Sequence, residues 1–174
     1  VAGTAAGLAF ECAMRRPIQK NDVIYMEMGG THNRYNCMLS RTVIVGKPGQ
    51  RWIDMYNASR DGLNAAKAKI KPGAVSHDVD RAAREIINKA GFGTYFMHRT
   101  GYSIGIGFPP DWGEGRIMSL NENDPTVLEA GMCFHLIPDL KGLDDGGVVC
   151  SESLVVTDTG YRLLADYPQD LIYK

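Results

Sequence analysis

Residues 20–45 read KNDVIYMEMGGTHNRYNCMLSRTVIV, and this stretch decides the fold. An apolar run at 23–28, a polar turn at 29–34 and a second run at 35–45 form the pattern of a β-hairpin. The turn-forming sequence Gly-Lys-Pro-Gly then closes the second run. We therefore expect two antiparallel strands whose side chains alternate between two faces.

Two helices are expected after this strand pair. Residues 50–70 carry apolar side chains at roughly helical spacing, and the next segment reads Lys-Pro-Gly, which stops a helix. Residues 76–90 repeat the pattern; Ser76 is suited to be the N-cap, and Gly91 ends the helix.

A glycine-rich segment and two more apolar runs complete the chain. The glycine-rich segment is 101–108, and the runs at 132–137 and 148–157 read as strands. The order of strands, helices and strands predicts an α+β domain in which helices cover one face of a mainly antiparallel sheet.

Composition excludes several classes of partner. The 174 residues include 19 basic and 20 acidic side chains, which argues against a nucleic acid or membrane-surface partner. No apolar run approaches the roughly 18 residues of a membrane span. None of the cysteines forms a Cys-x-x-Cys pair, so we expect reduced, buried thiols in a cytoplasmic protein; they are Cys12, Cys37, Cys133 and Cys150.

Five blocks in fixed order carry a resemblance to a known family; they are residues 20–29, 40–46, 98–105, 129–138 and 152–160. In spacing and flanks they resemble the pita-bread domain of the creatinase/aminopeptidase family, which includes methionine aminopeptidase, Xaa-Pro aminopeptidase and prolidase. The resemblance implies a curved, mainly antiparallel sheet covered by helices. It also implies that residues 1–174 are a C-terminal catalytic domain, incomplete at its N-terminus and lacking an N-terminal domain, from a homodimeric protein.

In the family's metallopeptidases, two Asp, one His and two Glu residues bind two divalent metals. The resemblance places these positions on Glu27, Met38, Tyr102, Ile137 and Ser151, with Glu152 replacing Ser151 if that strand has a bulge. Methionine and isoleucine cannot supply the oxygen and imidazole ligands that such metals need. We therefore expect no metal and no other cofactor.

Titratable side chains are expected at the position where the family's metallopeptidases bind their metals. Strand alternation places Glu27 on the site face and His135 on the same face as Ile137, while Tyr102 points there by its loop position. Burial would raise the pKa of Glu27 and favour acid/base or nucleophilic work. The alternatives are a salt-bridged Glu27 and a core His135. Glu152 is a fourth catalytic candidate if a bulge re-aims it.

Other residues are predicted to bind the substrate. Arg99 and Arg41 could each pair with a carboxylate, although a solvated or structural arginine is the alternative. His98 precedes the glycine loop and is kept as a binding candidate. Trp112 belongs to a stretch, residues 108–114, that reads as a rigid wall with an aromatic lid or as a plain surface turn. Tyr35 is the fifth predicted substrate-binding residue.

Among the metal-free branches of the family, the sequence is most similar to ectoine hydrolases, on the basis of Glu27, the HRTGYS loop, the PPDWGE stretch and Phe134-His135. The resemblance implies a small-molecule substrate, a cyclic amidine that opens to acetyl-diaminobutyrate. Glu27 would attack the amidinium carbon or activate water, and His135 and Tyr102 would move protons. The alternatives are an Xaa-Pro metallopeptidase and a pita-bread module that only binds.

Overall fold

The structure, a computed structural model, describes residues 2, 16–107, 112–142 and 146–174. Cys12 and the first part of the predicted wall, residues 108–111, lie outside the described residues. The helices, in chain order, are α1 (Gln50–Lys67), α2 (Ser76–Lys89) and the short 3-10 helix η2 (Gly93–Tyr95). The strands are β1 (Val23–His32), β2 (Tyr35–Ile44), β3 (Gly101–Ser103), β4 (Ser119–Leu120), β5 (Cys133–Leu136), β6 (Leu140–Gly142), β7 (Gly146–Val148), β8 (Glu152–Val156), β9 (Tyr161–Leu163) and β10 (Ile172–Tyr173).

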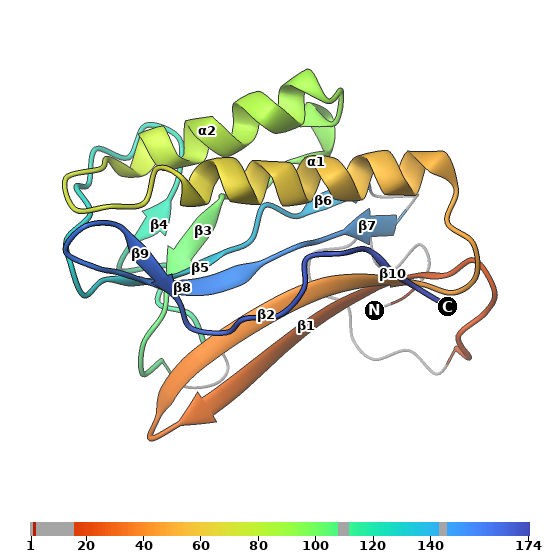
Figure 1. The fold of residues 1–174 in the computed structure, drawn as a ribbon, viewed down its shortest axis with the longest axis horizontal. Coiled ribbons are helices and arrows are strands. Elements are labelled where there is room, and N and C mark those ends of the chain that lie inside the picture. The colour runs from red at the N-terminus through yellow and green to blue at the C-terminus, as the bar shows by residue number, and fades with distance from the viewer. Residues whose placement is uncertain (1, 3–15, 108–111, 143–145) are drawn as a thin grey trace.

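The strands form three small sheets with the helices on one side. Their orders are β1-β2-β10, β4-β3-β5-β8-β9 and β6-β7, and the strand pairs are antiparallel except for β10 beside β2. Figure 1 shows α1 and α2 side by side above the sheets, while the β1–β2 hairpin extends away from the helices. This arrangement confirms the predicted α+β architecture with helices over one face of a mainly antiparallel sheet.

The β1–β2 hairpin is longer than the sequence suggested. Pairing runs without interruption from Val23 opposite Ile44 to His32 opposite Tyr35. The turn is therefore only Asn33 and Arg34, with φ of 47° and 72°, because a two-residue hairpin turn needs positive φ at both positions. The prediction of a turn over residues 29–34 was wrong because glycines can continue a strand.

The helices agree with the prediction apart from their ends. α1 stops at Lys67, three residues before the expected end, and Gly91 follows α2 with a φ of +84°. The prediction of Ser76 as the N-cap was wrong, because Ser76 is the first helical residue and Val75 is the N-cap. The Ser76 hydroxyl donates to the Ser119 carbonyl at 3.0 Å. The two helices pack on the large sheet through a buried core that includes Tyr56, Leu63, Ile87, Phe134, Leu136 and Leu154.

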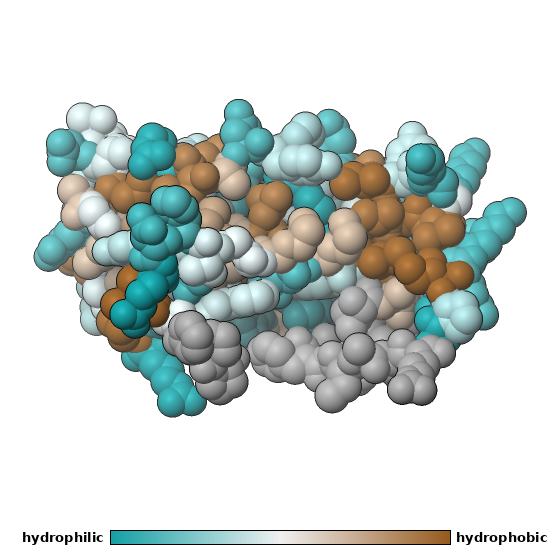
Figure 2. Space-filling view, turned by 90° about the horizontal axis from the view of Figure 1, so that it is seen from below, coloured by the Kyte–Doolittle hydropathy of each residue, from teal (hydrophilic) through white to brown (hydrophobic). Residues whose placement is uncertain are grey.

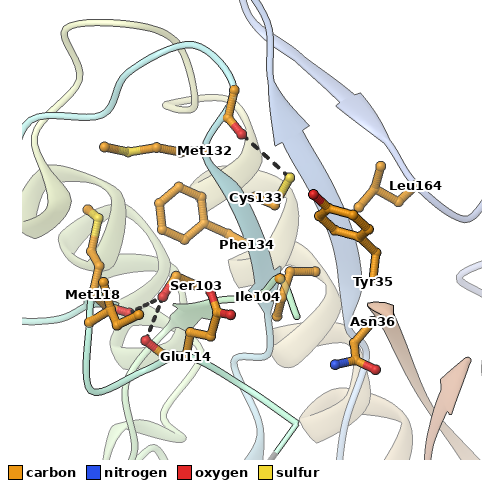
Figure 3. Close-up of a pocket in the computed structure, with 13 residues that line it drawn as sticks. Tyr35, Asn36, Ser103, Ile104, Glu114, Met118, Met132, Cys133, Phe134 and Leu164 are labelled. Atoms are coloured by element: carbon orange, nitrogen blue, oxygen red, sulfur yellow. Dashed lines mark hydrogen bonds between the residues drawn. The ribbon is translucent and has the colours of Figure 1, made fainter. Parts of the chain in front are cut away.

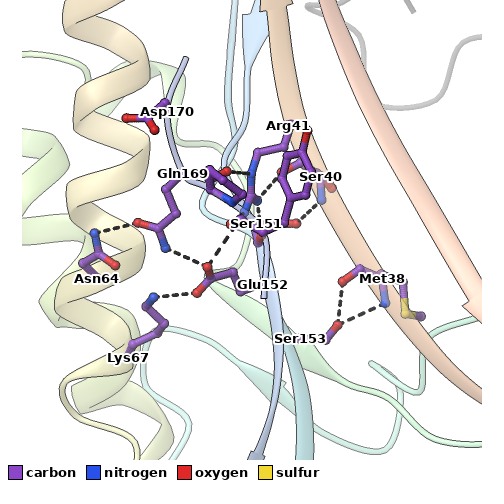
Figure 4. A network of polar contacts seen from close by, with 12 residues as sticks. Met38, Ser40, Arg41, Asn64, Lys67, Ser151, Glu152, Ser153, Gln169 and Asp170 are labelled. Carbon is purple, nitrogen blue, oxygen red and sulfur yellow. Dashed lines mark hydrogen bonds and ion pairs between the residues drawn. The ribbon is translucent and has the colours of Figure 1, made fainter. Parts of the chain in front are cut away.

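Side-chain hydroxyls join β2 to the segment that leads into β8. Ser153 Oγ accepts the Met38 N–H at 3.1 Å and donates to the Met38 carbonyl at 2.8 Å. Ser151 Oγ accepts the Ser40 N–H at 2.6 Å. Thr42 Oγ1 accepts the Val149 N–H at 2.7 Å and donates to the Val149 carbonyl at 3.0 Å. These hydroxyl bridges, partly drawn in Figure 4, and a main-chain bond from the Ser151 N–H to the Ser40 carbonyl at 3.1 Å hold the hairpin against the large sheet.

The outer face carries a mixed surface. Figure 2 shows the molecule from below, from the side of the hairpin; apolar residues are interspersed with polar ones and gather mainly toward the right-hand end. Within the described ranges, no helix is long and apolar enough to cross a membrane.

The contact between α1 and α2 gives a stability prediction. A Cβ added at Gly62 would lie 3.0 Å from Ile87 side-chain atoms and 3.4 Å from the Ala83 carbonyl. We expect Gly62→Leu to lower the free energy of unfolding by about 1–3 kcal/mol, because the tightly packed helices must move apart. Urea denaturation measures this change. Asp61→Leu, at the exposed neighbouring position, is the control, and equal destabilisation by both substitutions would contradict the prediction.

Candidate active site

Adjacent strands bring the predicted catalytic groups together on the sheet face away from the helices. Tyr102 of β3 is the register partner of His135 of β5. Glu27 of β1 approaches from the hairpin, with its Oε1 3.9 Å from His135 Nδ1. Tyr102 belongs to a buried apolar cluster whose other members are Tyr25, Met38, Ile104, Ile137 and Val149. The sequence-based prediction placed Glu27, His135 and Tyr102 together, and the structure does so.

His135 is the centre of this group. Its Nδ1 lies 2.9 Å from Tyr102 Oη and its Nε2 lies 2.7 Å from Ser151 Oγ. The side chain is fully buried, and burial lowers its pKa from 6.5 to about 3. At neutral pH the ring is therefore uncharged, with one donor nitrogen and one acceptor nitrogen.

The donors in this chain of hydrogen bonds run in one direction. Tyr102 has a single proton, and a hydrogen bond from Tyr102 lowers the pKa of Glu27, so the proton points at that carboxylate. His135 Nδ1 must then donate to Tyr102, which leaves Nε2 to accept the Ser151 hydroxyl proton. The Trp112 indole N–H also donates to Tyr102 Oη, at 3.3 Å. The chain thus runs from Ser151 through His135 and Tyr102 to Glu27, and each bond polarises the next.

Glu27 is held in a balance of opposing effects. Burial raises its pKa first, and the negative charge of Asp139 raises it further. The positive charge of Lys141 and the Tyr102 hydrogen bond lower it. The side chain keeps 27% of its exposure, so a ligand can reach this carboxylate. A reachable carboxylate with a raised pKa suits proton transfer or nucleophilic attack.

Glu152 is not part of this group, and the structure contradicts its predicted catalytic role. Strand alternation without a bulge turns Ser151 to His135 and Glu152 to α1. There its Oε2 pairs with Lys67 Nζ at 2.5 Å and its Oε1 accepts the Gln169 amide at 2.8 Å. Figure 4 shows these contacts on the helix side of the strand. Glu152 is thus a buried structural charge.

Arg41 is also structural, which contradicts its predicted substrate-binding role. It is 1% exposed and donates to the carbonyls of Ser40 and Ser151 at 2.8 and 2.6 Å. Its remaining nitrogens donate to the Pro168 and Tyr167 carbonyls, both at 2.8 Å. Because its donors are occupied by backbone carbonyls, Arg41 cannot bind a substrate carboxylate.

Arg99 lies closer to the site. Its guanidinium stands 4.8 Å from the Tyr102 ring centroid, and Nη1 donates to Ser119 Oγ at 3.2 Å. Its Nε is buried without a hydrogen-bond partner among the described residues. His98, the preceding residue, is exposed, and its carbonyl accepts Arg84 Nη2 at 2.9 Å.

Tyr35 and Trp112 lie on the rim. Tyr35 is 67% exposed and lines a cavity of about 520 Å³ with Ser103, Glu114, Met118, Cys133 and Leu164. Figure 3 shows Ser103, Glu114 and Met118 on one side of it and Tyr35 and Leu164 on the other. Glu27 and His135 are not among the lining residues. Trp112 is 37% exposed and packs on Gly29, where a Cβ would lie 3.1 Å from its ring. A larger residue at this position of β1 would push the indole away.

The donors near Glu27 do not fit a pair of divalent metals. Both ring nitrogens of His135 are occupied by protein hydroxyls, and Met38 and Ile137 offer no hard ligand. In the part of the chain that the structure describes, no three His, Cys, Asp or Glu side chains are grouped to hold a metal ion.

Two polar groups of the site were not among the predicted catalytic or binding residues. Ser151 was considered only as the position of a lost metal ligand, yet its hydroxyl fixes His135. Asp139 accepts the Tyr25 hydroxyl at 3.2 Å and pairs with Lys141. Its place two residues after Ile137 was the available signal. The three described cysteines are free, but only Cys150 is fully buried, as Cys37 and Cys133 are partly exposed.

Comparisons with known proteins identify the family. A family model described as metallopeptidase family M24 matches residues 2–158. An ectoine hydrolase of Halomonas elongata is 37% identical over 91% of this chain and 39% of that protein. An Xaa-Pro dipeptidase of Lactobacillus helveticus is 33% identical over 88% of this chain and 40% of that protein.

The solved structures give the same picture. A dipeptidase from Pyrococcus horikoshii superposes with a TM-score of 0.90 and 28% identity, over 99% of this chain and 47% of that one. This likeness confirms the predicted pita-bread fold. The chain spans less than half the length of each of these relatives.

The ion pair at Glu152 gives a second prediction. Replacing Lys67 by Met leaves the buried Glu152 carboxylate without its nearest cation, so we expect the free energy of unfolding to fall by about 3 kcal/mol. Urea denaturation measures the loss. Lys69→Met, at an exposed position near the same helix end, should cost far less, and equal denaturation midpoints for the two variants would contradict the structural role.

The buried His135 gives a third prediction. Its pKa is lowered in the folded state, so the stability that depends on the neutral ring is complete above about pH 6.5 and is lost as the pH falls toward 3. Each pH unit in this window removes up to about 1.4 kcal/mol through this group. Replacing His135 by Gln should therefore flatten the pH dependence of unfolding in urea. The exposed substitution His32→Gln is the control and should keep the wild-type slope. An unchanged slope for His135→Gln would show that the ring does not titrate as described.

Proposed function

Because the chain belongs to metallopeptidase family M24, whose relatives compared above are hydrolases, we propose that it hydrolyses a carbon–nitrogen bond without a metal ion. The proposed reaction is the ring opening of the cyclic amidine ectoine to acetyl-diaminobutyrate. The observation that carries the proposal is the chain of hydrogen bonds that ends on Glu27, in place of residues able to bind two metals. The similarity to an ectoine hydrolase supports the choice of substrate.

Glu27 performs the first step of the proposed reaction. An amidinium cation is attracted to this partly buried carboxylate, and the attraction is strong where water is scarce. Glu27 then either attacks the amidinium carbon or takes a proton from a water molecule that attacks it. A carbon–oxygen bond forms, and one carbon–nitrogen bond breaks in return. If Glu27 itself attacks, a water molecule then cleaves the bond between Glu27 and the substrate carbon, so both routes add one water to the substrate.

Tyr102 and His135 support this step. The Tyr102 hydroxyl donates to Glu27 and stabilises its charged form, which the reaction needs. Once Glu27 has taken a proton from the attacking water, Tyr102 can pass its own proton to the departing nitrogen and receive the Glu27 proton in return, so that both groups end in their starting state. His135 Nδ1, 2.9 Å from the Tyr102 hydroxyl, holds that hydroxyl in place. Ser151, at 2.7 Å from Nε2, holds the ring in one orientation.

The substrate carboxylate is assigned to Arg99. Arg41 is occupied by backbone carbonyls, whereas Arg99 stands beside Tyr102 with its Nε unpaired within the described residues. His98, Trp112 and Tyr35 are proposed as the outer wall of the binding site. We expect a small-molecule substrate, without nucleic acid or membrane, and the homodimer and the cytoplasmic location stay predictions.

The second candidate is an Xaa-Pro dipeptidase, which the similarity to the enzyme of Lactobacillus helveticus supports. Such an enzyme would need hard metal ligands where this chain carries Met38, Tyr102, Ile137 and Ser151. A third candidate, a module that binds without catalysis, does not require a raised pKa at Glu27 or the aligned hydrogen bonds.

The test is hydrolysis by the full-length natural protein after treatment with a chelator. We expect mass spectrometry to detect ectoine converted to a product one water heavier. Glu27→Gln should lower kcat by at least about 100-fold, since it removes the base or nucleophile. Glu129→Gln, at an exposed position, should behave as the wild type.

Two outcomes would decide for the alternatives. Xaa-Pro cleavage that appears when manganese is added, without ectoine turnover, would identify a metallopeptidase. Ectoine binding that is equal in the wild type and Glu27→Gln, without turnover of ectoine or an Xaa-Pro dipeptide, would identify a binding module.

A further inference from the structure

A second carboxylate, that of Asp139, is held by the β1 face that carries Glu27 and has no part in the proposed reaction. Asp139 is 4% exposed, and the hydroxyl of Tyr25 donates to its Oδ2 at 3.2 Å. Tyr25 and Glu27 stand two residues apart on β1, so their side chains share one face of the hairpin. Tyr25 thus anchors Asp139 on the face of the sheet that carries Glu27.

Only one oxygen of Asp139 is satisfied. Oδ2 is bound by Tyr25 and pairs with Lys141 Nζ, which also stands 5.0 Å from the Tyr25 ring centroid. Oδ1 is buried and has no hydrogen-bond partner in the described parts of the chain. Leaving a buried carboxylate oxygen unpaired costs free energy, and native structures rarely do so without a reason.

The negative charge of Asp139 also affects Glu27. It raises the pKa of Glu27, which means that the two carboxylates are close enough to repel each other. A bound cation relieves this repulsion, and its N–H group can satisfy Oδ1. A neutral amide of the same shape offers an N–H group but no charge, so it gains less.

We propose that Asp139 determines the specificity of the site: its Oδ1 accepts an N–H from a cationic amidinium, which selects such ligands over neutral amides of the same shape. This inference rests on the proposed function and assigns to Asp139 the recognition of the substrate's positive charge. Asp139 binds the nitrogen side of the amidinium group while Glu27 faces the reacting carbon. Lys141 moderates the charge so that the unliganded site tolerates two carboxylates.

The test compares two probes of equal shape, acetamidinium and acetamide, on the full-length natural protein. Ligand-observed NMR titration gives a dissociation constant for each. We expect the wild type to prefer acetamidinium by about tenfold or more, the ratio typical of one charge-assisted hydrogen bond. Asp139→Asn should lose most of this preference. Asp158→Asn removes the same charge at an exposed turn and should keep it.

A second variant protects the test against misfolding. Asp139→Asn leaves Lys141 without its partner, so Asp139→Asn with Lys141→Met removes both charges and avoids a lone buried cation. Thermal melting followed by circular dichroism confirms that the variants are folded. The double variant should also lose the preference for acetamidinium.

The outcomes separate this inference from the proposed function. A preference that depends on Asp139 supports the inference even if ectoine is not turned over. Ectoine turnover with an unchanged preference in the folded Asp139 variants would overturn the inference and leave the proposed function standing. The absence of any preference in the wild type would also overturn it.

Discussion

The hydroxyl of Ser151 is the contact on which the site depends. It accepts the Ser40 N–H at 2.6 Å and lies 2.7 Å from His135 Nε2, so one side chain joins the hairpin to the large sheet and fixes the imidazole. A hydroxyl can do both because it accepts and donates at once. The neighbouring bridges at Ser153 and Thr42 hold the same seam. The approach of Glu27 to His135 therefore follows from how the two sheets are joined.

The uncharged ring of His135 sets the direction in which the hydrogen bonds of the site donate. A protonated ring would donate from both nitrogens, whereas the neutral ring must accept at one of them. Since Tyr102 turns its proton to Glu27, each group donates toward the carboxylate. The same burial that keeps His135 neutral raises the pKa of Glu27. One apolar environment thus produces two effects of opposite sign on an imidazole and a carboxyl.

The buried charges of Glu152 and Arg41 fix the register of the segment that carries Ser151. Glu152 meets Lys67 and Gln169 on the helix side, and Arg41 ties the Ser151 carbonyl to the C-terminal segment. A slip of one residue would turn Glu152 toward His135 and Ser151 toward α1, because strand side chains alternate. The slip would bury an unpaired carboxylate among apolar groups, at a high cost in free energy. Ser151, which holds His135, and the structural charge of Glu152 therefore point to opposite faces of the same segment.

The sequence by itself determined the order of the elements, the helix-covered antiparallel sheet and the shared face of Glu27, His135 and Tyr102. These features follow from local periodicity and from motif order, which a linear sequence contains. Only the tertiary structure decided that Glu152 and Arg41 are structural and that Ser151 and Asp139 belong to the site. The physical reason is separation along the chain: Arg41 meets Ser151 across 110 residues and Tyr25 meets Asp139 across 114. Whether a buried charge finds a protein partner or is left for a ligand depends on such distant contacts, which no local pattern records.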